Sequence, residues 1–282
     1  MVPVRRPFLK WAGGKVRLIP RIRRRLPPGR RLVEPFAGSA AVWLNCEYPE
    51  ALLADANPDL INCYQQLKQH GKAFIEACRA YFVPENNRPE RYYALRERFN
   101  HSQDGLERAL LFVYLNRHGY NGLCRYNRKG LFNVPFGRYR RPYFPEHEMW
   151  EFLKHAKHTT FVNADFRSVL AAARPGDVVY CDPPYVPWSK TAHFTAYSQE
   201  GFGPEEQAEL AVWAQRLAEQ GIPVLISNHA TPFTLQAYGD AQIERFSVQR
   251  HISCDVDHRE AVDELLAFFA PRQDVEAHKL KG

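Results

Sequence analysis

The 282-residue sequence predicts an α/β protein whose sheet domain is interrupted by a helical insertion. Short apolar segments that alternate with helical patterns predict parallel strands, at 31–34, 51–54, 161–162, 178–181 and 223–227. Between the second and third of these segments, the apolar residues recur at helical spacing. An acidic tetrapeptide, Asp182-Pro183-Pro184-Tyr185, directly follows one strand, which is where open α/β sheets place their ligands.

The order of the elements predicts a discontinuous sheet domain, residues 1–56 and 146–282, and an insertion, residues 57–145. The insertion is expected to contain four helices followed by a loop-rich segment, at 58–69, 71–82, 89–99, 105–116 and 116–143. The sheet domain is expected to contain helices at 40–46, 146–156, 204–219 and 231–238. The segments 243–248 and 262–269 predict an antiparallel pair that closes the edge of the sheet.

Composition favours a soluble protein with a polyanionic partner. The net charge is +7, and arginines and lysines concentrate in the first 31 residues and again at 125–141. No apolar segment is long enough to span a membrane, and the first residues lack the apolar core of a signal peptide, so a cytoplasmic location is expected. The six cysteines show no CxxC pair, which argues against a structural metal site.

The turn after the first strand has the features of a cofactor site. Gly38 lies between a predicted strand and a predicted helix, where a residue without a side chain lets a ligand approach the backbone. Asp55 ends the next strand, which suits an acid that binds ribose hydroxyls. The sequence lacks both the GxGxxG and the Walker pattern that phosphates require, so S-adenosylmethionine is favoured over NAD or ATP. An ordinary βα turn with a capping aspartate is the alternative.

The segment Phe8–Lys15 permits two interpretations. It could be a flexible arm with one anchoring tryptophan. It could instead be a flap hinged at Gly13 and Gly14, with Trp11 over the cofactor and Lys15 reaching its carboxylate. An aromatic ring beside a sulfonium would add cation–π attraction.

Several motifs in a fixed order identify a resemblance that covers nearly the whole chain. They are FLKWAGGK (8–15), LVEPFAGSAAVWLN (32–45), LNRHGYNGLCRYN (115–127), FNVPFGRYRRPYFP (132–145), YCDPPY (180–185), IPVLISNH (222–229) and VDELLAFF (262–269). This set resembles the Dam-type DNA adenine-N6 methyltransferases, which act at GATC. The resemblance implies a Rossmann-like S-adenosylmethionine-dependent methyltransferase sheet with an inserted helical DNA-recognition module.

The resemblance also implies roles for individual residues. Asp182 and the carbonyl of Pro183 would accept hydrogen bonds from the adenine N6, and Tyr185 would stack on the flipped base. The cofactor would lie against residues drawn from four parts of the chain: Trp11, Lys15, Phe36, Gly38, Asp55, Asp165, Phe166 and Asp182. Plain structural roles remain open for Phe36, as a core aromatic residue, and for Asp165, as a helix cap.

Contacts to double-stranded DNA are implied for the loop-rich segment. Arg125 would bind a guanine edge, and Tyr120, Asn121 and Leu123 would insert beside the flipped base. Neighbouring bases would be contacted by Pro135, Arg138, Tyr139 and Lys10. Arg128, Arg140, Arg141 and the Arg21–Arg25 run are either phosphate contacts or a solvated face. The acidic segment Ser253–Glu260 departs from the family's basic loop and would repel phosphate.

The leading hypothesis is therefore base flipping and direct methyl transfer to adenine N6 by a monomer, without a metal or a covalent intermediate. Cytosine-N4 methylation keeps the fold and changes the substrate, as does methylation of a glutamine amide. A DNA-binding regulator without activity is the alternative from another class, but Asp182 and Gly38 are both intact. Cys181 is interpreted as the buried last residue of a strand rather than as a nucleophile.

Overall fold

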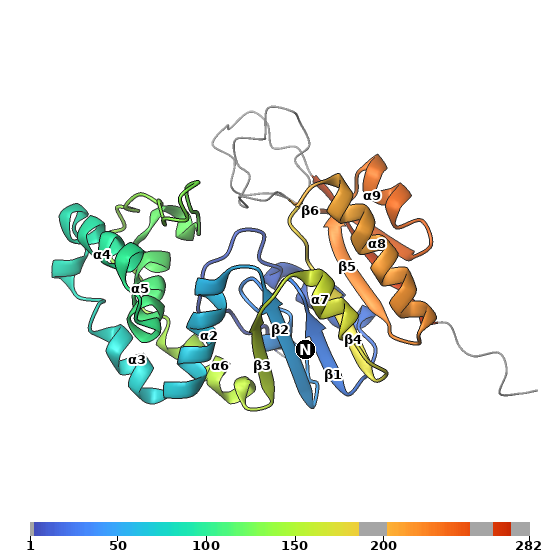
Figure 1. Ribbon diagram of the computed structural model, residues 1–282, viewed down its shortest axis with the longest axis horizontal. Coiled ribbons are helices and arrows are strands. Elements are labelled where there is room, and N and C mark those ends of the chain that lie inside the picture. Colours follow the sequence, from blue (N-terminus) through green and yellow to red (C-terminus); the bar gives the residue numbers. More distant parts are fainter. Residues whose placement is uncertain (1–2, 186–201, 249–261, 272–282) are drawn as a thin grey trace, which may run out of the picture.

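The computed structural model describes residues 3–185, 202–248 and 262–271, and its centre is a mixed seven-stranded sheet in the order β3-β2-β1-β4-β5-β7-β6 (Figure 1). The strands are β1 (Arg31–Glu34), β2 (Glu50–Asp55), β3 (Thr159–Asn163), β4 (Asp177–Cys181), β5 (Val224–His229), β6 (Gln242–Val248) and β7 (Val262–Phe269). All five strands from β3 to β5 in this order are parallel, whereas β7 is antiparallel to both β5 and β6.

The strand order reverses direction between β1 and β4. From β1 the chain proceeds outward to β2 and β3, and from β4 it proceeds the other way to β5. The loops that leave β1 and β4 therefore separate, and a crevice for a ligand is expected at their carboxyl ends. The segment after β1 contains Gly38 and the segment after β4 begins with Asp182, so the topology brings both to this point.

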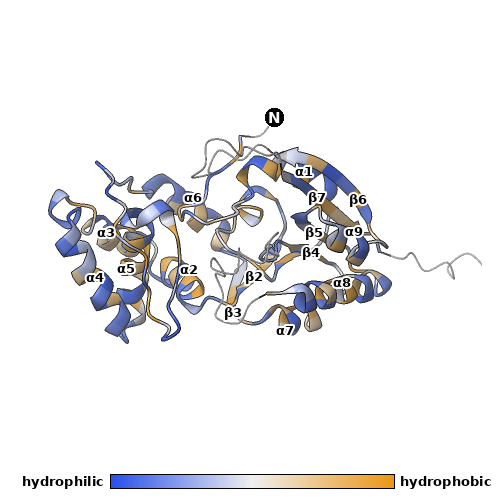
Figure 2. Cartoon of the chain, turned by 90° about the horizontal axis from the view of Figure 1, so that it is seen from above, coloured by the Kyte–Doolittle hydropathy of each residue, from blue (hydrophilic) through white to orange (hydrophobic). Residues whose placement is uncertain are grey.

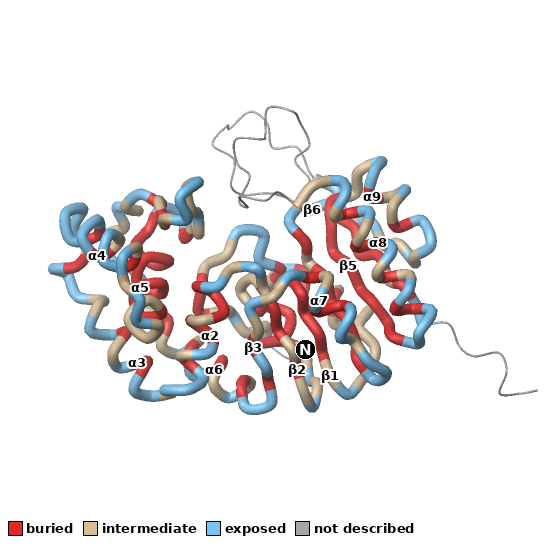
Figure 3. Tube along the Cα trace, viewed as in Figure 1, coloured by how far each residue is buried: buried red, intermediate tan, exposed pale blue. Residues whose placement is uncertain are grey.

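Alternation of side chains along the strands gives the sheet two apolar faces. Val33, Val179 and Ile226 point to one face and pack in one core with α7 (Phe166–Ala171) and α8 (Pro204–Glu219). The neighbouring positions point to the other face, which packs with three helices: α1 (Ile19–Arg25), α2 (Pro58–His70) and α6 (Glu146–Ala156). In Figure 2 the apolar residues concentrate between these layers, and Figure 3 shows the strands as the buried centre. Helix α9 (Pro232–Ala237) follows β5.

The insertion shares its core with the sheet. Helices α3 (Lys72–Arg79), α4 (Pro89–His101) and α5 (Gly105–His118) extend to one side of the sheet in Figure 1. Helix α2 packs against α5 and also against β3, and its buried residues belong to the same apolar cluster as those of the sheet. Asn57 and Asp104 cap the amino ends of α2 and α5 by accepting backbone hydrogen bonds. Thus α2 joins the insertion to the sheet.

Most predicted elements are confirmed within a few residues, including the antiparallel pair β6–β7 at the sheet edge. The predicted helix at 40–46 is wrong, because only a short 3-10 turn forms there, Trp43–Asn45. Ala40 has a φ of 59°, a left-handed conformation that an α-helix cannot contain. Helix α1 was not predicted, because its arginine-rich sequence hides two buried isoleucines, Ile19 and Ile22.

The first segment of the chain is packed rather than free. We call residues 3–15 the arm. Phe8 and Leu9 are buried in the core, at 2% and 3% exposure, and the side chain of Lys15 is 6% exposed. The arm therefore has a defined path across the molecule, although it belongs to no strand.

Two expectations from composition can be compared with the described residues. None of the helices in the described ranges is long and apolar enough to cross a membrane. The described cysteines, among them the buried Cys181, form no disulfide. The acidic segment 253–260 lies outside the described residues.

The left-handed Ala40 leads to a stability prediction. Replacing Ala40 by glycine removes a strain of about 1–2 kcal/mol, which offsets the lost methyl burial and the added backbone entropy. We expect Ala40→Gly to change the free energy of unfolding by less than about 0.5 kcal/mol, whereas Ala41→Gly lowers it by roughly 1.5 kcal/mol. Ala41 is similarly buried, but its φ is not positive. Urea unfolding measures both variants, and equal losses would contradict the argument.

Candidate active site

The carboxylate of Asp182 lies at the carboxyl end of β4 and is held through one oxygen. Its Oδ1 accepts from the Lys15 ammonium at 2.8 Å and from the Ser227 hydroxyl at 3.0 Å. The Asp182 side chain is 21% exposed, whereas Lys15 is nearly covered. Among the described residues, neither Oδ2 of Asp182 nor the carbonyl of Pro183 has a hydrogen-bond donor. These two acceptors belong to consecutive residues at the end of β4, and Pro183 itself is buried.

The tetrapeptide itself is fixed from behind by a buried polar network. Gln207 of α8, which is fully buried, donates from its amide to the carbonyl of Pro184 at 2.8 Å. Its other atom, Oε1, accepts from Asn228 at 2.9 Å and from the Tyr238 hydroxyl at 2.8 Å. Every member has a partner, so the network stabilises one backbone conformation after Asp182.

The ring of Tyr185 lies next to His229 and Lys15. The centroids of Tyr185 and His229 are 4.0 Å apart and the rings are tilted by 44°. The Lys15 ammonium lies 4.7 Å from the centroid of the Tyr185 ring. Tyr185 is half-buried, so the ring is anchored at the end of the sheet with part of it facing the solvent.

The turn after β1 is shaped by contacts at Gly38, whose φ is 47°. Its N–H donates to Oδ2 of Asp55 at 3.0 Å, and Asp55 Oδ1 accepts from the Asn57 N–H at 2.9 Å. A Cβ at Gly38 would lie 3.0 Å from the indole of Trp11, so a larger residue would displace the ring. Burial raises the pKa of Asp55. The predicted trio of Trp11, Gly38 and Asp55 is therefore brought together.

Phe36 and Phe166 stack on each other, with centroids 5.4 Å apart and an interplanar angle of 28°. Phe202 meets both rings edge-on. Phe166 is buried, whereas Phe36 is half-buried. Asp165 is exposed and caps α7 by accepting from the Arg167 N–H at 2.9 Å. The structural roles considered for Phe36 and Asp165 are thus present, and they leave the side chain of Asp165 accessible.

Glu34 is a buried acid that the sequence analysis did not single out. It ends β1, is 2% exposed, and its Oε1 has no hydrogen-bond partner. Burial raises its pKa to about 8, and the negative charge of Asp182 acts in the same direction, while the Trp43 N–H opposes the shift. Glu34 is therefore a neutral carboxyl group below this pH, beneath the turn that contains Gly38.

The loop-rich segment after α5 folds back on itself. Gly119 pairs with Phe136 and Tyr126 with Phe132, and the tip is closed by the Gly130 N–H, which donates to the carbonyl of Asn127. The segment therefore has a hairpin-like path, which we call the hairpin. Tyr120, Asn121, Arg125 and Pro135 are exposed on it, and Leu123 is partly buried.

Tyr139 connects the predicted DNA contacts to the arm. Its hydroxyl accepts from the Asn121 N–H at 2.9 Å, and the Lys10 ammonium lies 4.3 Å from its ring centroid. Burial and the charge of Arg117 lower the pKa of Lys10. Asn121 and Arg138 have φ of 52° and 54°, which is strained backbone at exposed positions.

Several arginines that could have met phosphates have partners within the chain. Arg21 and Arg25 of α1 both bond to Glu244 of β6, at 2.7 and 2.8 Å, and Arg23 donates to the carbonyl of Asn45. Arg24 remains exposed. The side chain of Arg125 donates to Oδ1 of Asn133 at 2.8 Å, which holds it along the hairpin.

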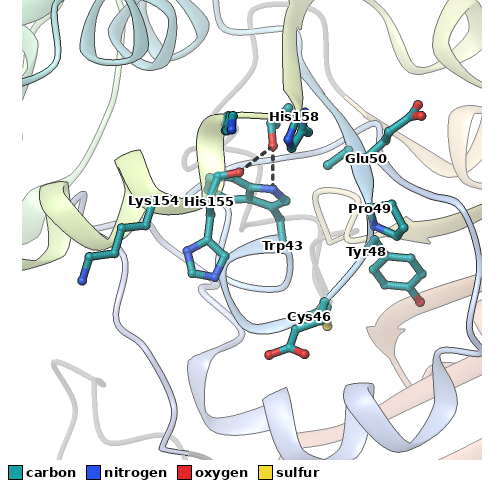
Figure 4. Close-up of a pocket in the computed structure, with 12 residues that line it drawn as sticks. Trp43, Cys46, Tyr48, Pro49, Glu50, Lys154, His155 and His158 are labelled. Atoms are coloured by element: carbon teal, nitrogen blue, oxygen red, sulfur yellow. Dashed lines mark hydrogen bonds between the residues drawn. The ribbon is translucent and has the colours of Figure 1, made fainter.

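A cavity of about 460 Å³ lies away from these residues, at the amino ends of β2 and β3 (Figure 4). Trp43 donates to the Thr159 hydroxyl at 3.0 Å in its wall, and that hydroxyl donates to the carbonyl of His155 at 3.2 Å. Its lining contains both lysines and glutamates. Asp182 lies at the opposite, carboxyl end of the strands, so the cavity is separate from the candidate site.

Sequence reasoning missed Ser227 and Gln207, which position the tetrapeptide. Ser227 stands near the carboxyl end of a strand, like Asp182, and this position was a usable signal. Gln207 occupies the apolar face of α8 in register with Leu210, Ala211 and Ala214. A polar residue at such a position indicates a buried hydrogen bond.

Comparison with known proteins gives one family. Residues 11–252 match the model described as D12 class N6 adenine-specific DNA methyltransferase. The chain is 50% identical to the DNA adenine methylase of Vibrio cholerae over 96% of this chain and 99% of that protein. It is 51% identical to the DNA adenine methylase of Escherichia coli K12, over 94% of this chain and 96% of that protein.

The buried Glu34 generates a pH prediction. Its pKa rises from 4.5 to about 8 on folding, so the unfolded chain releases this proton first and stability falls as the pH rises through this window, by at most about 1.4 kcal/mol per pH unit. Glu34→Gln mimics the neutral acid and removes this contribution. Urea unfolding between pH 5 and pH 8 compares the two proteins. Parallel pH profiles for the wild type and the variant would show that Glu34 is not the titrating group.

Proposed function

The chain belongs to the D12 class N6 adenine-specific DNA methyltransferases, and we propose that it methylates adenine at GATC in double-stranded DNA, with S-adenosylmethionine as the methyl donor. The enzyme class follows from the family. The observation that carries the site assignment is the pair of acceptors at Asp182 and Pro183, which has the chemistry that an exocyclic amine requires. The alternative of cytosine-N4 methylation receives no support from the comparisons.

The residues around Gly38 suit S-adenosylmethionine. Trp11 packs against Gly38, which places an aromatic ring beside a turn that has no side chain at this position, and Asp55 provides carboxylate acceptors for hydroxyl groups. The half-buried Phe36, which stacks on Phe166, adds an aromatic ring to this site. When bound, the cofactor supplies an electrophilic methyl group on a sulfonium. Aromatic and acidic side chains stabilise such a cation.

Asp182 acts on the target amine through its free oxygen. Lys15 and Ser227 occupy Oδ1, so Oδ2 and the carbonyl of Pro183 accept the two N6 hydrogens. Bonding both hydrogens favours a pyramidal nitrogen and directs its lone pair toward the methyl group. Placement of the two reactants in line supplies much of the rate enhancement. The proton lost after transfer leaves by Asp182 or to water.

The target base must leave the duplex to reach this site, because N6 inside the helix is engaged in base pairing. The Tyr185 ring, anchored by His229, would stack on the extruded adenine. Tyr120, Asn121 and Leu123 of the hairpin would fill the space left in the duplex. Arg125 would bind a guanine edge, and Pro135, Arg138, Tyr139 and Lys10 would contact neighbouring bases.

We assign the Rossmann-like methyltransferase fold to residues 1–56 and 146–282 and DNA recognition to the insertion, residues 57–145. The exposed basic residues of the hairpin suit a duplex partner. We further propose that the protein acts on chromosomal DNA in the cytoplasm as a monomer.

The direct test is to incubate the purified protein with methyl-labelled S-adenosylmethionine and two duplexes, one containing GATC and one in which a single base pair is changed. Label in N6-methyladenine of the GATC duplex alone supports the proposal. Equal labelling of both duplexes would overturn the GATC assignment, and label in cytosine would overturn the target.

Substitution of Asp182 tests the acceptor pair. Asp182→Ala is expected to abolish turnover while leaving the fold intact, and to lower the thermal midpoint, because the nearly covered Lys15 ammonium loses its ion pair. Asp182→Asn is expected to retain some activity, since an amide oxygen still accepts one hydrogen bond. The exposed Asp240→Ala is the control. Turnover by Asp182→Ala at the control rate would refute the role.

Substitution of Arg125 tests base recognition. Arg125→Ala is expected to reduce discrimination at one base pair by about 1–3 kcal/mol. Arg128→Ala at the exposed tip is the matched control, and it should weaken binding on all sequences equally. Ratios of kcat/KM on singly substituted duplexes measure both. A sequence-independent loss for Arg125→Ala would make it a phosphate contact.

A further inference from the structure

Two asparagine side chains form hydrogen bonds with backbone groups of the arm, in the same pattern as the backbone of a neighbouring strand would. The peptide groups of Arg5 donate to Asn45 Oδ1 at 2.8 Å and accept from its Nδ2 at 2.9 Å. Lys10 makes the same pair of bonds with Asn116, both at 2.8 Å. A primary amide offers one donor group and one acceptor, so it can replace a peptide group in a ladder.

These contacts come from different parts of the molecule. Asn45 lies between β1 and β2, whereas Asn116 lies near the end of α5 in the insertion. Both side chains are buried, at 1% and 2% exposure. The neighbouring Arg117 also donates to the carbonyl of Phe8 at 3.0 Å. The insertion therefore satisfies backbone groups of the arm that would otherwise be buried without partners.

At Lys10 the arm meets the turn Tyr120–Gly122, which we call the recognition loop. Asn116 Nδ2 donates at 3.2 Å to the carbonyl of Gly122, in the same turn as Tyr120 and Asn121. A Cβ at Gly122 would lie 2.4 Å from Cβ of Lys10, so the Lys10 side chain packs directly on the Gly122 backbone. One buried amide thus bonds the arm and the recognition loop simultaneously.

Five residues later the arm reaches the acceptor carboxylate. Trp11 lies against Gly38, and Lys15 shares Oδ1 of Asp182 with Ser227. The Lys15 ammonium also donates to the carbonyl of Gly13 at 2.7 Å, where the arm turns with a φ of 76°. The arm therefore connects Lys10, which is bonded to Asn116, with Lys15, which is bonded to Asp182.

We propose that Asn116 is a positioning residue that couples recognition of the DNA sequence to methyl transfer. The contact of Arg125 with the guanine edge and the insertion of Tyr120 and Asn121 beside the flipped base set the position of Gly122. Asn116 transfers that position to the arm and to Lys15. Asn116 contacts neither the bases nor the acceptor pair. The inference rests on the proposed function, because it needs a preferred DNA sequence.

The test compares Asn116→Ala with Asn100→Ala. Asn100 makes an equivalent clamp on Phe132 of the hairpin, with bonds of 2.8 and 3.2 Å, but neither of these bonds involves the arm. For Asn116→Ala we expect kcat on the preferred duplex to fall at least tenfold. The KM for DNA should change less than threefold, and the kcat/KM ratio between preferred and singly altered duplexes should fall at least tenfold. Asn100→Ala should keep that ratio.

If Asn116 has only a structural role, Asn116→Ala should lower the thermal midpoint as Asn100→Ala does. Both variants should then discriminate between the preferred and altered duplexes as well as the wild type does. That result would overturn the inference, as would an equal loss of discrimination in both. If the wild type itself shows no sequence preference, the proposed function fails first. If the wild type discriminates and Asn116→Ala discriminates equally, only the coupling fails.

Hydrogen exchange of the wild type gives a readout that does not depend on folding of a variant. The Lys10 N–H is bonded to Asn116, so its exchange reports the clamp. We expect protection of the peptide covering residues 8–15 to differ at least threefold between complexes with the preferred duplex and with a singly altered duplex. Identical protection in the two complexes would overturn the coupling.

Discussion

The ion pair between Lys15 and Asp182 is the interaction on which the site depends. It places a cation beside one oxygen of a carboxylate, Oδ1, which also accepts from the Ser227 hydroxyl, and Oδ2 has no donor among the described residues. The pair also fixes the end of the arm, and through it the position of Trp11 over Gly38. The charge of Lys15, the hydrogen bonds to Asp182 and the shape of the turn at Gly38 are thus linked to one another.

The sheet supplies the geometry for this arrangement. Strands β1 and β4 are parallel neighbours, and the chain continues from them to opposite sides of the sheet. The turns that follow them therefore lie at the same end of the sheet, where a crevice is expected. Burial on both faces of the sheet keeps these strand ends rigid. The Gln207 network then restricts the backbone after Asp182 to one conformation.

The sequence predicted the strands and most helices, because apolar periodicity follows directly from which faces are buried. It failed at residues 40–46, where the positive φ of Ala40 outweighed a helical pattern. Asp182, Gly38 and Asp55 could be found because each ends a strand or opens a turn. Ser227 and Gln207 carried a local signal, but their partners, like those of Asn116, are distant in sequence, so the contacts themselves could not be assigned. The partners of Arg21 and Arg25 were hidden for the same reason.

Helix α2 has a consequence for engineering. Its residues pack simultaneously against α5 and against β3, so it belongs to the core of the sheet as well as to the insertion. A chimaera that exchanges sequence specificity with a relative therefore cannot be spliced where the insertion starts. The junction belongs after Gly71, so that the donor segment begins beyond the shared helix and the recipient keeps its own interior intact.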